Sequence, residues 1–415
     1  MNQPQITPAI PAAAALSGKL PTSNYWSVAH FEDELEYVFR RSWINLCRAD
    51  EIPKPGDFLV QEMYAIGTSV LVVHGEDSVL RAFHNMCSHR GNRVAVDRQG
   101  NKKWFSCLFH GWTYDHEGHL VGLPQSNKFS TVDKAQGGLT PIHLDVWGGF
   151  VYICLAEQPP CTLEEFMQPL TQRLGAHFGD QIWYRGFRLG VEVNCNWKLP
   201  YDAVSEFYHF NSLHPKSIGG GFSMKDTSPA VIFSEQAGVV GHFETFYAKT
   251  EAFLEPTPIQ KLAAELGAGG IHTKSTAIEF KTRYPDAINL HKREDWAVDM
   301  YATLPHVAYL ILEQSFNVQR VWPIAFNRCY ITTELWTLTP PPRNFAEVFN
   351  ASAVNSRTVD IIAEDFSTLE RIQQNLIHGP VRNFHYSSEE SQVKGLQDLI
   401  QVWIDRGKAT KDGAQ

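Results

Sequence analysis

Two short stretches of this chain, CSHRG at residues 87–91 and CLFHGW at residues 107–112, decide how the chain folds. Each stretch pairs one cysteine with one histidine, as Cys-x-His in the first and Cys-x2-His in the second. Seventeen residues separate His89 from Cys107. A glycine closes each motif, at Gly91 and Gly111, where the lack of a side chain lets backbone amides come close to a bound group. The two stretches therefore predict one shared metal site on two loops.

The alternation of thiolate and imidazole predicts a Rieske [2Fe–2S] cluster bound by Cys87, His89, Cys107 and His110. In such a cluster two thiolates bind one iron and two neutral imidazoles bind the other, which raises the reduction potential, so the cluster accepts an electron readily. The alternative is a structural zinc site, which also uses two cysteines and two histidines. Zinc fingers keep the two cysteines together and the two histidines together, so the spacing favours iron and sulfide.

Length and composition limit the possible classes of protein. A chain of 415 residues has room for two or three domains. The chain is 43% hydrophobic and 20% charged, as expected for a soluble protein, and its net charge of −9 argues against nucleic acid as a partner. No run of eighteen apolar residues predicts a membrane span. Five of the seven cysteines remain after the cluster is assigned and are scattered, which argues against disulfides and favours a reducing cytoplasm.

Turn residues and breaks in the pattern suggest the domain limits. Short β-prone runs separated by glycines fill the region around the cluster motifs, and two prolines at residues 159–160 end it. His116 and His119 fall in a predicted hairpin turn, so we expect them to face solvent rather than to bind metal. The predicted organisation is a tail and helix at residues 1–45 that packs with the second domain, a cluster domain at residues 46–156, and a second domain at residues 157–415 with long helices at residues 346–376 and 388–404.

A second candidate metal site lies between residues 196 and 215. Glu206 and His209 are three residues apart, so a helix would place them on one face. His209 and His214 are five residues apart, a spacing that no regular helix aligns, and Pro215 disfavours helical geometry at His214. We therefore expect the helix to unwind there and to bring the second imidazole towards the first.

Two histidines and one carboxylate form the facial triad of non-haem Fe(II) oxygenases, which leaves positions open for O2. The best candidate for the carboxylate is Asp365, on an amphipathic stretch that predicts a helix. By spacing alone, the acidic pair Glu364 and Asp365 fits a solvated helix face equally well, and two histidines five residues apart need not be related. The cluster motif upstream favours the iron site.

Taken together, the cluster motifs, the Asn196-Trp197-Lys198 stretch and the Glu206-x2-His209-x4-His214 motif resemble the large (alpha) subunit of Rieske non-haem iron oxygenases of the aromatic-ring-hydroxylating type. The resemblance extends from Trp43 to the C-terminal helices. It implies an α+β fold with two domains. One is a small antiparallel β domain that holds the [2Fe–2S] Rieske cluster, and the other is a helix-grip catalytic domain, an antiparallel sheet with a long helix, that holds iron.

The same resemblance implies roles for four residues. His209, His214 and Asp365 would bind the mononuclear Fe(II), and Glu206 would be the bridging carboxylate. In this family that carboxylate accepts hydrogen bonds from an iron-ligand histidine and from a cluster histidine of the neighbouring subunit, so electrons cross between the subunits of a trimer. Such a carboxylate fixes both imidazole tautomers and couples the two sites.

The chain departs from the usual family pattern at two places. The bridging position usually holds aspartate, and glutamate, as in Glu206, occurs in the branch that oxidises quaternary amines such as carnitine and betaine. Tyr201 and Asp202 replace a usual Glu-Asn pair. We expect the added negative charge of Asp202 to raise the pKa of a neighbouring histidine.

The predicted function is that of a terminal oxygenase which uses O2 and two electrons to hydroxylate an organic substrate, with cis-dihydroxylation of an aromatic ring favoured. Monooxygenation or O- or N-demethylation, including oxidation of quaternary amines, is the alternative, and an iron–sulfur electron carrier is a more distant one. No GxGxxG fingerprint predicts a nicotinamide or flavin domain, so NAD(P)H would act through a partner reductase, directly or through a ferredoxin. Basic residues that could steer an acidic carrier are Arg90, Arg93, Lys102 and Lys103. A homotrimer is expected, and a beta subunit is left open.

Overall fold

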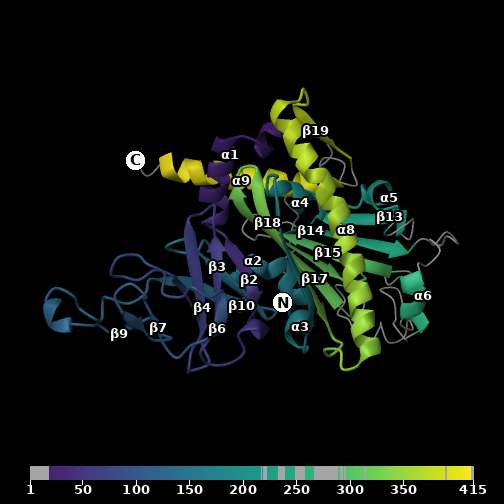
Figure 1. Cartoon of the computed structure of the whole chain (residues 1–415). Helices are drawn as coiled ribbons and strands as arrows, with labels where there is room; N and C mark the ends of the chain where they lie inside the picture. Colours follow the sequence, from purple (N-terminus) through teal and green to yellow (C-terminus); the bar gives the residue numbers. More distant parts are fainter. Residues whose placement is uncertain are drawn as a thin grey trace, which may run out of the picture. The chain divides into compact units, whose positions relative to one another are not determined.

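The computed structural model describes residues 18–215, 217, 222–231, 239–247, 258–265, 288–289, 293, 296–312, 315–387 and 390–412. The chain forms two compact units, one from Val38 to Glu165 and the other from the residues up to Tyr37 together with those from Phe166 onward. Figure 1 shows the strands of both units and the two long C-terminal helices. None of the described helices is both long and apolar enough to cross a membrane.

The unit from Val38 to Glu165 is built on an antiparallel sheet of seven strands in the order β2-β11-β10-β5-β4-β3-β6. A second, three-stranded sheet has the order β7-β8-β9. The strands are β2 (Trp43–Arg48), β3 (Asp57–Met63), β4 (Thr68–His74), β5 (Leu80–His84), β6 (Gln99–Asn101), β7 (Phe105–Ser106), β8 (Thr113–Tyr114), β9 (Leu120–Gly122), β10 (Pro141–Trp147) and β11 (Phe150–Cys154).

The sheets of this unit place the two cluster motifs next to the apolar core. Residues 87–91 follow β5, and residues 107–112 connect β7 to β8. The side chain of Asn85 fixes the first loop, because it donates to the Ala95 carbonyl (2.8 Å) and accepts from the amides of Val94 and Ala95. Both motif cysteines are part of the buried core, which also contains Phe105, Trp112 and Tyr114.

The other unit contains a second antiparallel sheet of seven strands in the order β12-β18-β17-β16-β15-β14-β13. The elements of this unit are β1 (Gly18–Pro21), α1 (Val28–Glu34), α3 (Ala176–Gly179), β12 (Tyr184–Val193), α4 (Lys198–Ala203), α5 (Phe210–Leu213), β13 (Phe222–Val231), β14 (Val239–Tyr247), α6 (Pro258–Glu265), β15 (Trp296–Thr303), β16 (Val307–Ile311), β17 (Ser315–Ala325), β18 (Arg328–Thr337), α8 (Phe345–His378), β19 (Asn383–Tyr386) and α9 (Ser391–Asp412). Helix α2 (Leu163–Leu170) spans the division between the units.

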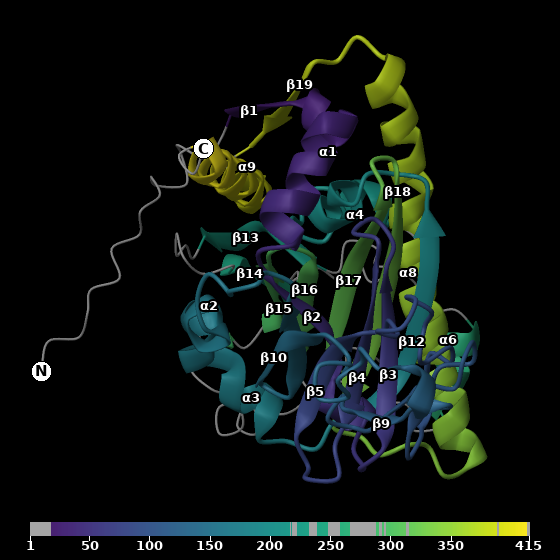
Figure 2. The same ribbon diagram turned by 90° about the vertical axis from the view of Figure 1, so that its left-hand side faces the viewer.

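Helix α8 runs along the sheet of this unit, beside β12 (Figure 2). The Asn344 side chain caps its first turn by accepting from the Glu347 amide. Ile362, Leu369 and Leu376 recur at seven-residue intervals and are buried, so one face of the helix supplies the core. The sheet and the long helix confirm the predicted α+β class.

Segments from both ends of the chain lie beside α4, which leads to the second candidate site. Strand β1 pairs with β19, as Figure 2 shows at the top of the unit. Glu34 at the end of α1 accepts from the Trp197 indole (2.8 Å) and forms a fully buried ion pair with Lys198. A π-helical turn, Leu35–Phe39, follows α1, where the sequence predicts one longer regular helix.

Candidate active site and metal centres

The two cluster loops have the same backbone conformation. In each loop the cysteine amide donates to the carbonyl five residues later, at 2.7 Å for Cys87 and 2.8 Å for Cys107. The amides of Gly91 and Gly111 donate back to the carbonyls of these cysteines at 2.9 Å. Both glycines have a left-handed backbone, with φ of 76° and 74°, which a residue with a side chain rarely adopts. The glycines that the sequence analysis singled out therefore shape the two loops.

The four predicted cluster ligands come together from these loops. The thiols of Cys87 and Cys107 are buried and form no disulfide. The rings of His89 and His110 lie nearer the surface, with centroids 4.6 Å apart, and His89 stacks on Trp112 at 4.8 Å. Two buried thiols on one side and two imidazoles on the other are the donor set of a Rieske cluster, so the residues present fit that group.

Hydrogen-bond donors surround both sulfurs. The Tyr114 hydroxyl lies 3.1 Å from the Cys87 sulfur, and the Asn92 amide donates to the Cys107 sulfur at 3.7 Å. Burial opposes the Cys107 thiolate, but hydrogen bonds from the Phe109 amide and Asn92 outweigh it and lower the pKa of this thiol. A thiolate is the form that binds metal.

The structure corrects one prediction about residues near the cluster. His116 is buried rather than facing solvent, and its Nε2 atom lies 2.7 Å from the Lys102 carbonyl, whereas His119 is exposed. Among the basic residues that could steer a carrier, Arg93 and Lys102 form ion pairs with Glu62 and Asp97, at 2.6 and 2.8 Å. Arg90 instead lies over the Phe109 ring at 5.3 Å.

The second constellation lies on a broken helix. Helix α4 ends at Ala203 and α5 begins at Phe210, so Glu206 and His209 occupy the turn between the two helices. The prediction that they share one face of a helix is therefore wrong. The cause is local, because the Glu206 carboxylate accepts from the backbone amides of Tyr208 and His209 and so competes with helical hydrogen bonds. Helix α5 ends directly before His214, as the following proline predicts.

His209, His214 and Asp365 meet in space. One ligand atom from each lies within 4.8 Å of the others. The Asp365 Oδ1 atom is 3.0 Å from His214 Nε2 and 3.4 Å from His209 Nε2. Among the described atoms, His214 Nε2 and Asp365 Oδ1 are buried and lack a well-formed hydrogen bond, although both are polar. Two imidazoles and one carboxylate with unsatisfied buried atoms fit a facial-triad iron site.

Electrostatics in this triad favour a bound cation. Burial disfavours the imidazolium form of His209, but its contacts with Asp365 and Glu206 outweigh burial and raise its pKa to about 9. The pKa of His214 is also raised against burial, by Asp365 and Glu364. Conversely, the two histidines hold the pKa of Asp365 below its usual value although burial opposes this. Protons on the histidines thus balance the carboxylates, and a divalent metal would replace them.

The second ring nitrogen of each triad histidine, Nδ1, is hydrogen-bonded to a carboxylate. Glu206 forms a short hydrogen bond with His209 Nδ1. Glu364 accepts from His214 Nδ1 at 2.8 Å and from the Ser217 hydroxyl at 2.5 Å. Such partners fix the tautomer and turn Nε2 towards the metal. The sequence pattern predicts no role for Glu364, and its place next to Asp365 is the one signal that points to it.

Helix α8 is fixed next to the segment that carries the histidines. Glu370 accepts from both the backbone amide and the side chain of Asn194, at 2.9 and 3.0 Å. Gln373 accepts from the Asn196 amide at 2.7 Å. These bonds hold the segment that leads into α4 against α8, and Asp365 lies two turns before Gln373 on the same helix.

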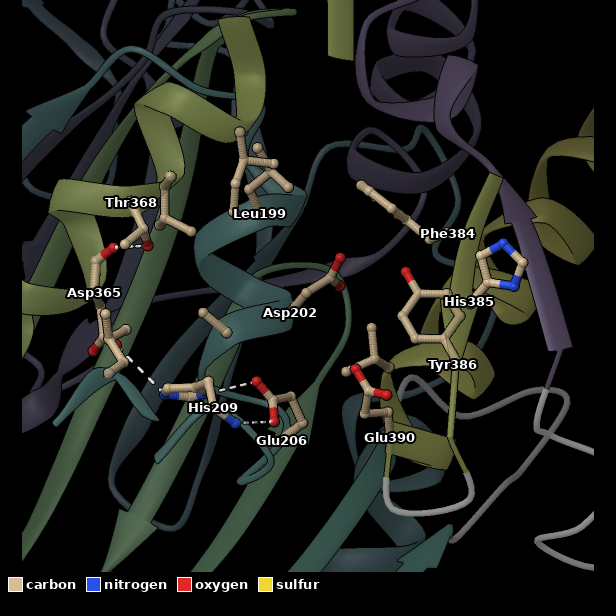
Figure 3. A pocket seen from close by; sticks show the side chains of 15 residues that line it. Leu199, Asp202, Glu206, His209, Asp365, Thr368, Phe384, His385, Tyr386 and Glu390 are labelled. Atoms are coloured by element: carbon tan, nitrogen blue, oxygen red, sulfur yellow. Dashed lines mark hydrogen bonds and ion pairs between the residues drawn. The ribbon is translucent and has the colours of Figure 1, made fainter. Parts of the chain in front are cut away.

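A cavity of about 260 Å³ opens beside the triad (Figure 3). His209 and Glu206 lie on one side of it, and Tyr386 and Glu390 on the other. The full lining is Leu199, Asp202, Ala203, Glu206, His209, Leu213, Asp365, Thr368, Leu369, Ile372, Phe384, His385, Tyr386, Glu390 and Val393. Phe207 is buried in a separate apolar cluster with Val298 and Met300, and its ring stacks on Phe210 at 3.7 Å.

Asp202 does not act on a histidine as predicted. Its carboxylate accepts hydrogen bonds from Tyr25 (2.5 Å) and Gln397 (2.8 Å). The raised pKa of His209 comes from Asp365 and Glu206 instead. The sequence cannot reveal this, because Tyr25 and Gln397 are 177 and 195 residues away from Asp202.

Family models match most of the chain. Residues 42–136 match the Rieske [2Fe-2S] domain, and residues 181–406 match the ring hydroxylating alpha subunit (catalytic domain). This chain belongs to the family of ring-hydroxylating alpha subunits, the oxygenase subunits that combine a Rieske domain with a catalytic domain.

Curated relatives carry several activities. The chain is 31% identical over 198 residues to the carnitine monooxygenase oxygenase subunit of Acinetobacter pittii (strain PHEA-2), covering 47% of this chain and 52% of the relative. It is 33% identical over 207 residues to the glycine betaine monooxygenase oxygenase subunit of Pseudomonas aeruginosa (strain UCBPP-PA14), covering 49% of this chain and 46% of the relative. It is 31% identical over 225 residues to the large oxygenase component of a Pseudomonas aeruginosa naphthalene 1,2-dioxygenase system, covering 50% of this chain and 45% of the relative. The matches span about half the length of these relatives.

Solved structures share the fold. A quaternary ammonium Rieske monooxygenase has a TM-score of 0.75 at 19% identity, with 95% of this chain and 98% of that chain covered. Naphthalene 1,2-dioxygenase from Rhodococcus sp. has a TM-score of 0.73 at 17% identity, with 93% and 94% covered. The similarity in fold thus extends over nearly the whole chain.

Proposed function

We propose that this chain is the terminal oxygenase component of a multi-component system that uses O2 and two electrons to oxidise an organic substrate. The observation that carries the proposal is the pair of donor sets. Cys87, His89, Cys107 and His110 would hold the [2Fe–2S] cluster, and His209, His214 and Asp365 would hold Fe(II). When bound, these groups would supply one-electron transfer and a site for O2.

The protein itself would supply orientation and coupling. Glu206 and Glu364 hold the Nδ1 protons of the two histidines, so both Nε2 atoms are available to the metal. We assign Glu206 the role of the bridging carboxylate, which would also accept from a cluster histidine of a neighbouring subunit. A positioned carboxylate between two imidazoles gives a short hydrogen-bonded route for the electron.

The substrate that we propose is a quaternary amine. The support is Glu206 at a position that is usually aspartate, together with relatives named as carnitine and glycine betaine monooxygenases. Cis-dihydroxylation of an aromatic compound, which the sequence analysis favoured, is the second candidate. The naphthalene 1,2-dioxygenase relative favours it.

The proposed assembly follows the family. A reductase would deliver electrons from NAD(P)H, directly or through a ferredoxin, to a homotrimer, with a beta subunit as a possible addition. We propose residues 46–156 as the Rieske domain, residues 157–415 as the catalytic domain, and residues 1–45 as a segment that packs with the latter. The seven cysteines form no disulfide, which supports a reducing cytoplasm as the location.

Labelled dioxygen distinguishes the two substrates. The full chain, loaded with both metals, would be supplied with a reductase and ¹⁸O2 and incubated with glycine betaine, carnitine or naphthalene. We expect a quaternary amine to be consumed with one labelled oxygen in its oxidised carbon and the other in water. A cis-diol from naphthalene with two labelled oxygens would replace the first candidate by the second. Absence of O2 consumption with all three would refute both candidates, and His209→Ala is the control for background oxidation.

A further inference from the structure

Asp202 is a partly buried acid that the proposed function does not use. It lies near the end of α4 and lines the same cavity as Glu206. Glu206 follows Asp202 by about one helical turn of sequence. In Figure 3 both side chains extend into the cavity from the same side, opposite Tyr386 and Glu390. Two carboxyl groups on one wall of a half-enclosed cavity repel each other when both are ionised.

Three distant segments of the chain hold Asp202 in place. The Tyr25 hydroxyl donates to Oδ2 at 2.5 Å, and the Gln397 side chain donates to Oδ1 at 2.8 Å. The Tyr386 hydroxyl lies 3.2 Å from the Tyr25 hydroxyl, and since Tyr25 donates to Asp202, Tyr386 donates to Tyr25. Burial and the nearby Asp202 raise the pKa of Tyr25 well above its usual value, so this phenol remains a donor. The carboxyl group of Asp202 therefore has one fixed orientation.

Among the residues that the structure describes, no cation is paired with Asp202 alone. Lys198 is the nearest basic residue of α4, but its amine is paired with the buried Glu34. The other titratable groups around Asp202 are Tyr25 before α1, Tyr201 on α4, Glu206 in the following turn, His385 and Tyr386 on β19, and Glu390 directly before α9. Further out, Asp398, which pairs with Lys394 on α9, acts on Tyr386. Most of these groups are neutral or acidic, so the surroundings favour the protonated acid.

We propose that Asp202 is a positioning residue of the oxygenase site, which carries a proton so that Glu206 can keep its negative charge and its hydrogen bond to His209 across the shared cavity. This inference rests on the proposed function. When Asp202 loses its proton, two carboxylates face one cavity, and the Glu206–His209 contact is the one that weakens. Tyr25, Tyr386 and Gln397 hold the acid in place.

The protonation of Asp202 supports this role. Burial raises its pKa to about 7, although the hydrogen bonds from Tyr25 and Gln397 and the charge of Lys198 oppose this. The acid is therefore mostly protonated one unit below that value and mostly ionised one unit above it. Turnover of the wild-type enzyme should fall about tenfold between these two pH values, in proportion to the protonated fraction.

The test compares pH profiles of the full metal-loaded chain. Asp202→Asn keeps the shape but cannot ionise, so its turnover should change by less than about twofold over the same range. Tyr25→Phe removes a hydrogen bond that favours the ionised form, so the midpoint should move to higher pH. Asp405→Asn, an exposed aspartate on α9 bonded only to Gln401 among the described contacts, should behave as the wild type. An Asp202→Asn enzyme with an unchanged midpoint, or a uniform loss at all pH values, would overturn the proposal.

An infrared measurement separates this proposal from the proposed function. The carbonyl band of a protonated carboxylic acid should disappear from the wild-type spectrum as pH rises through about 7 and be missing from Asp202→Asn at every pH. Its presence would support the inference even if none of the tested substrates is oxidised, in which case only the substrate proposal fails. No difference between the two spectra would refute the role of Asp202 independently of any activity.

Discussion

The two candidate metal sites of this chain are built in opposite ways. The cluster ligands come from residues 87–110, on two loops with the same backbone hydrogen bonds and a left-handed glycine each. The iron ligands come from a broken helix and from α8, and the contact between His214 and Glu364 joins residues 150 positions apart. The first site is therefore encoded locally, whereas the second exists only once α8 packs against the segment that leads into α4. We expect the two sites to lose their metals independently.

The largest effect should come from removing one ligand of each site. Cys107→Ser should lose the cluster and keep the mononuclear iron, whereas Asp365→Ala should lose the mononuclear iron and keep the coloured cluster. Turnover should fall by more than about 100-fold in both, beyond the range seen when only an outer partner of a metal ligand is removed. Iron and sulfide analysis with visible absorbance checks this. Full iron occupancy in Asp365→Ala would mean that another carboxylate is the third ligand.

Electron transfer between the two sites should be lost in a variant that still binds both metals. Glu206→Gln keeps the size of the side chain but removes its charge, so both metals should stay bound while turnover falls about 10- to 100-fold. Rapid mixing of the reduced protein with O2 and substrate should show slow reoxidation of the cluster. A variant that reoxidises its cluster at the wild-type rate would contradict the bridging role.

The carboxylate that holds His214 in place should affect the affinity of the site for Fe(II). Glu364→Ala leaves His214 Nδ1 and the Ser217 hydroxyl without their acceptor, so Fe(II) affinity should fall about 10- to 100-fold while the cluster is unaffected. Asp360→Asn, an exposed carboxylate on the same helix, is the matched control. Equal affinities in the two variants, measured by anaerobic titration, would show that Glu364 lies on a solvated face.

The two sites should also differ in their response to pH. The pKa of His209 is raised to about 9, so below this value a proton competes with Fe(II), and affinity should rise about tenfold per pH unit until about pH 9. In the metal-free protein the raised pKa of His209 also adds to the free energy of unfolding. This contribution is fully present below pH 6.5, the pKa of the histidine in the unfolded chain, and is lost as the pH rises through about 9. Titrations and thermal melts at several pH values check both signs. An affinity that does not change with pH would contradict the histidine assignment.

The smallest effect should be on the cluster potential. Burial and its contact with Cys87 raise the pKa of Tyr114 to about 12, so its hydroxyl remains a donor to the Cys87 sulfur. A donor stabilises the more negative reduced cluster. Tyr114→Phe should therefore lower the potential by roughly 40 mV, which is about 1 kcal/mol for one hydrogen bond and one electron. An unchanged potential in a spectroelectrochemical titration would show that the hydroxyl bonds elsewhere, for example to Ser88.

The sequence predicts the cluster site and much of the fold for one physical reason. Spacing along the chain fixes geometry within a loop or a helix. The two motifs predict the cluster loops, and apolar periodicity predicts a helix at residues 346–376 where the structure has α8 at Phe345–His378. Asp365 could be chosen only because the upstream motifs had already suggested an oxygenase.

The parts that failed depend on contacts between distant segments or on local competition. Glu206 bonds to backbone amides of its own turn, which breaks the helix expected there. His116 is buried, with its Nε2 atom 2.7 Å from a carbonyl fourteen residues away, and Asp202 accepts hydrogen bonds from Tyr25 and Gln397 rather than from a histidine. None of these partners leaves a periodic pattern in the sequence.

Metal and sulfide content per chain tests the central claim most directly. The anaerobically purified and reconstituted protein should contain about three iron atoms and two acid-labile sulfides, two of the irons in the cluster and one at the triad. About two irons with two sulfides would leave an electron carrier without an oxygenase site. Zinc in place of iron and sulfide would contradict the account altogether.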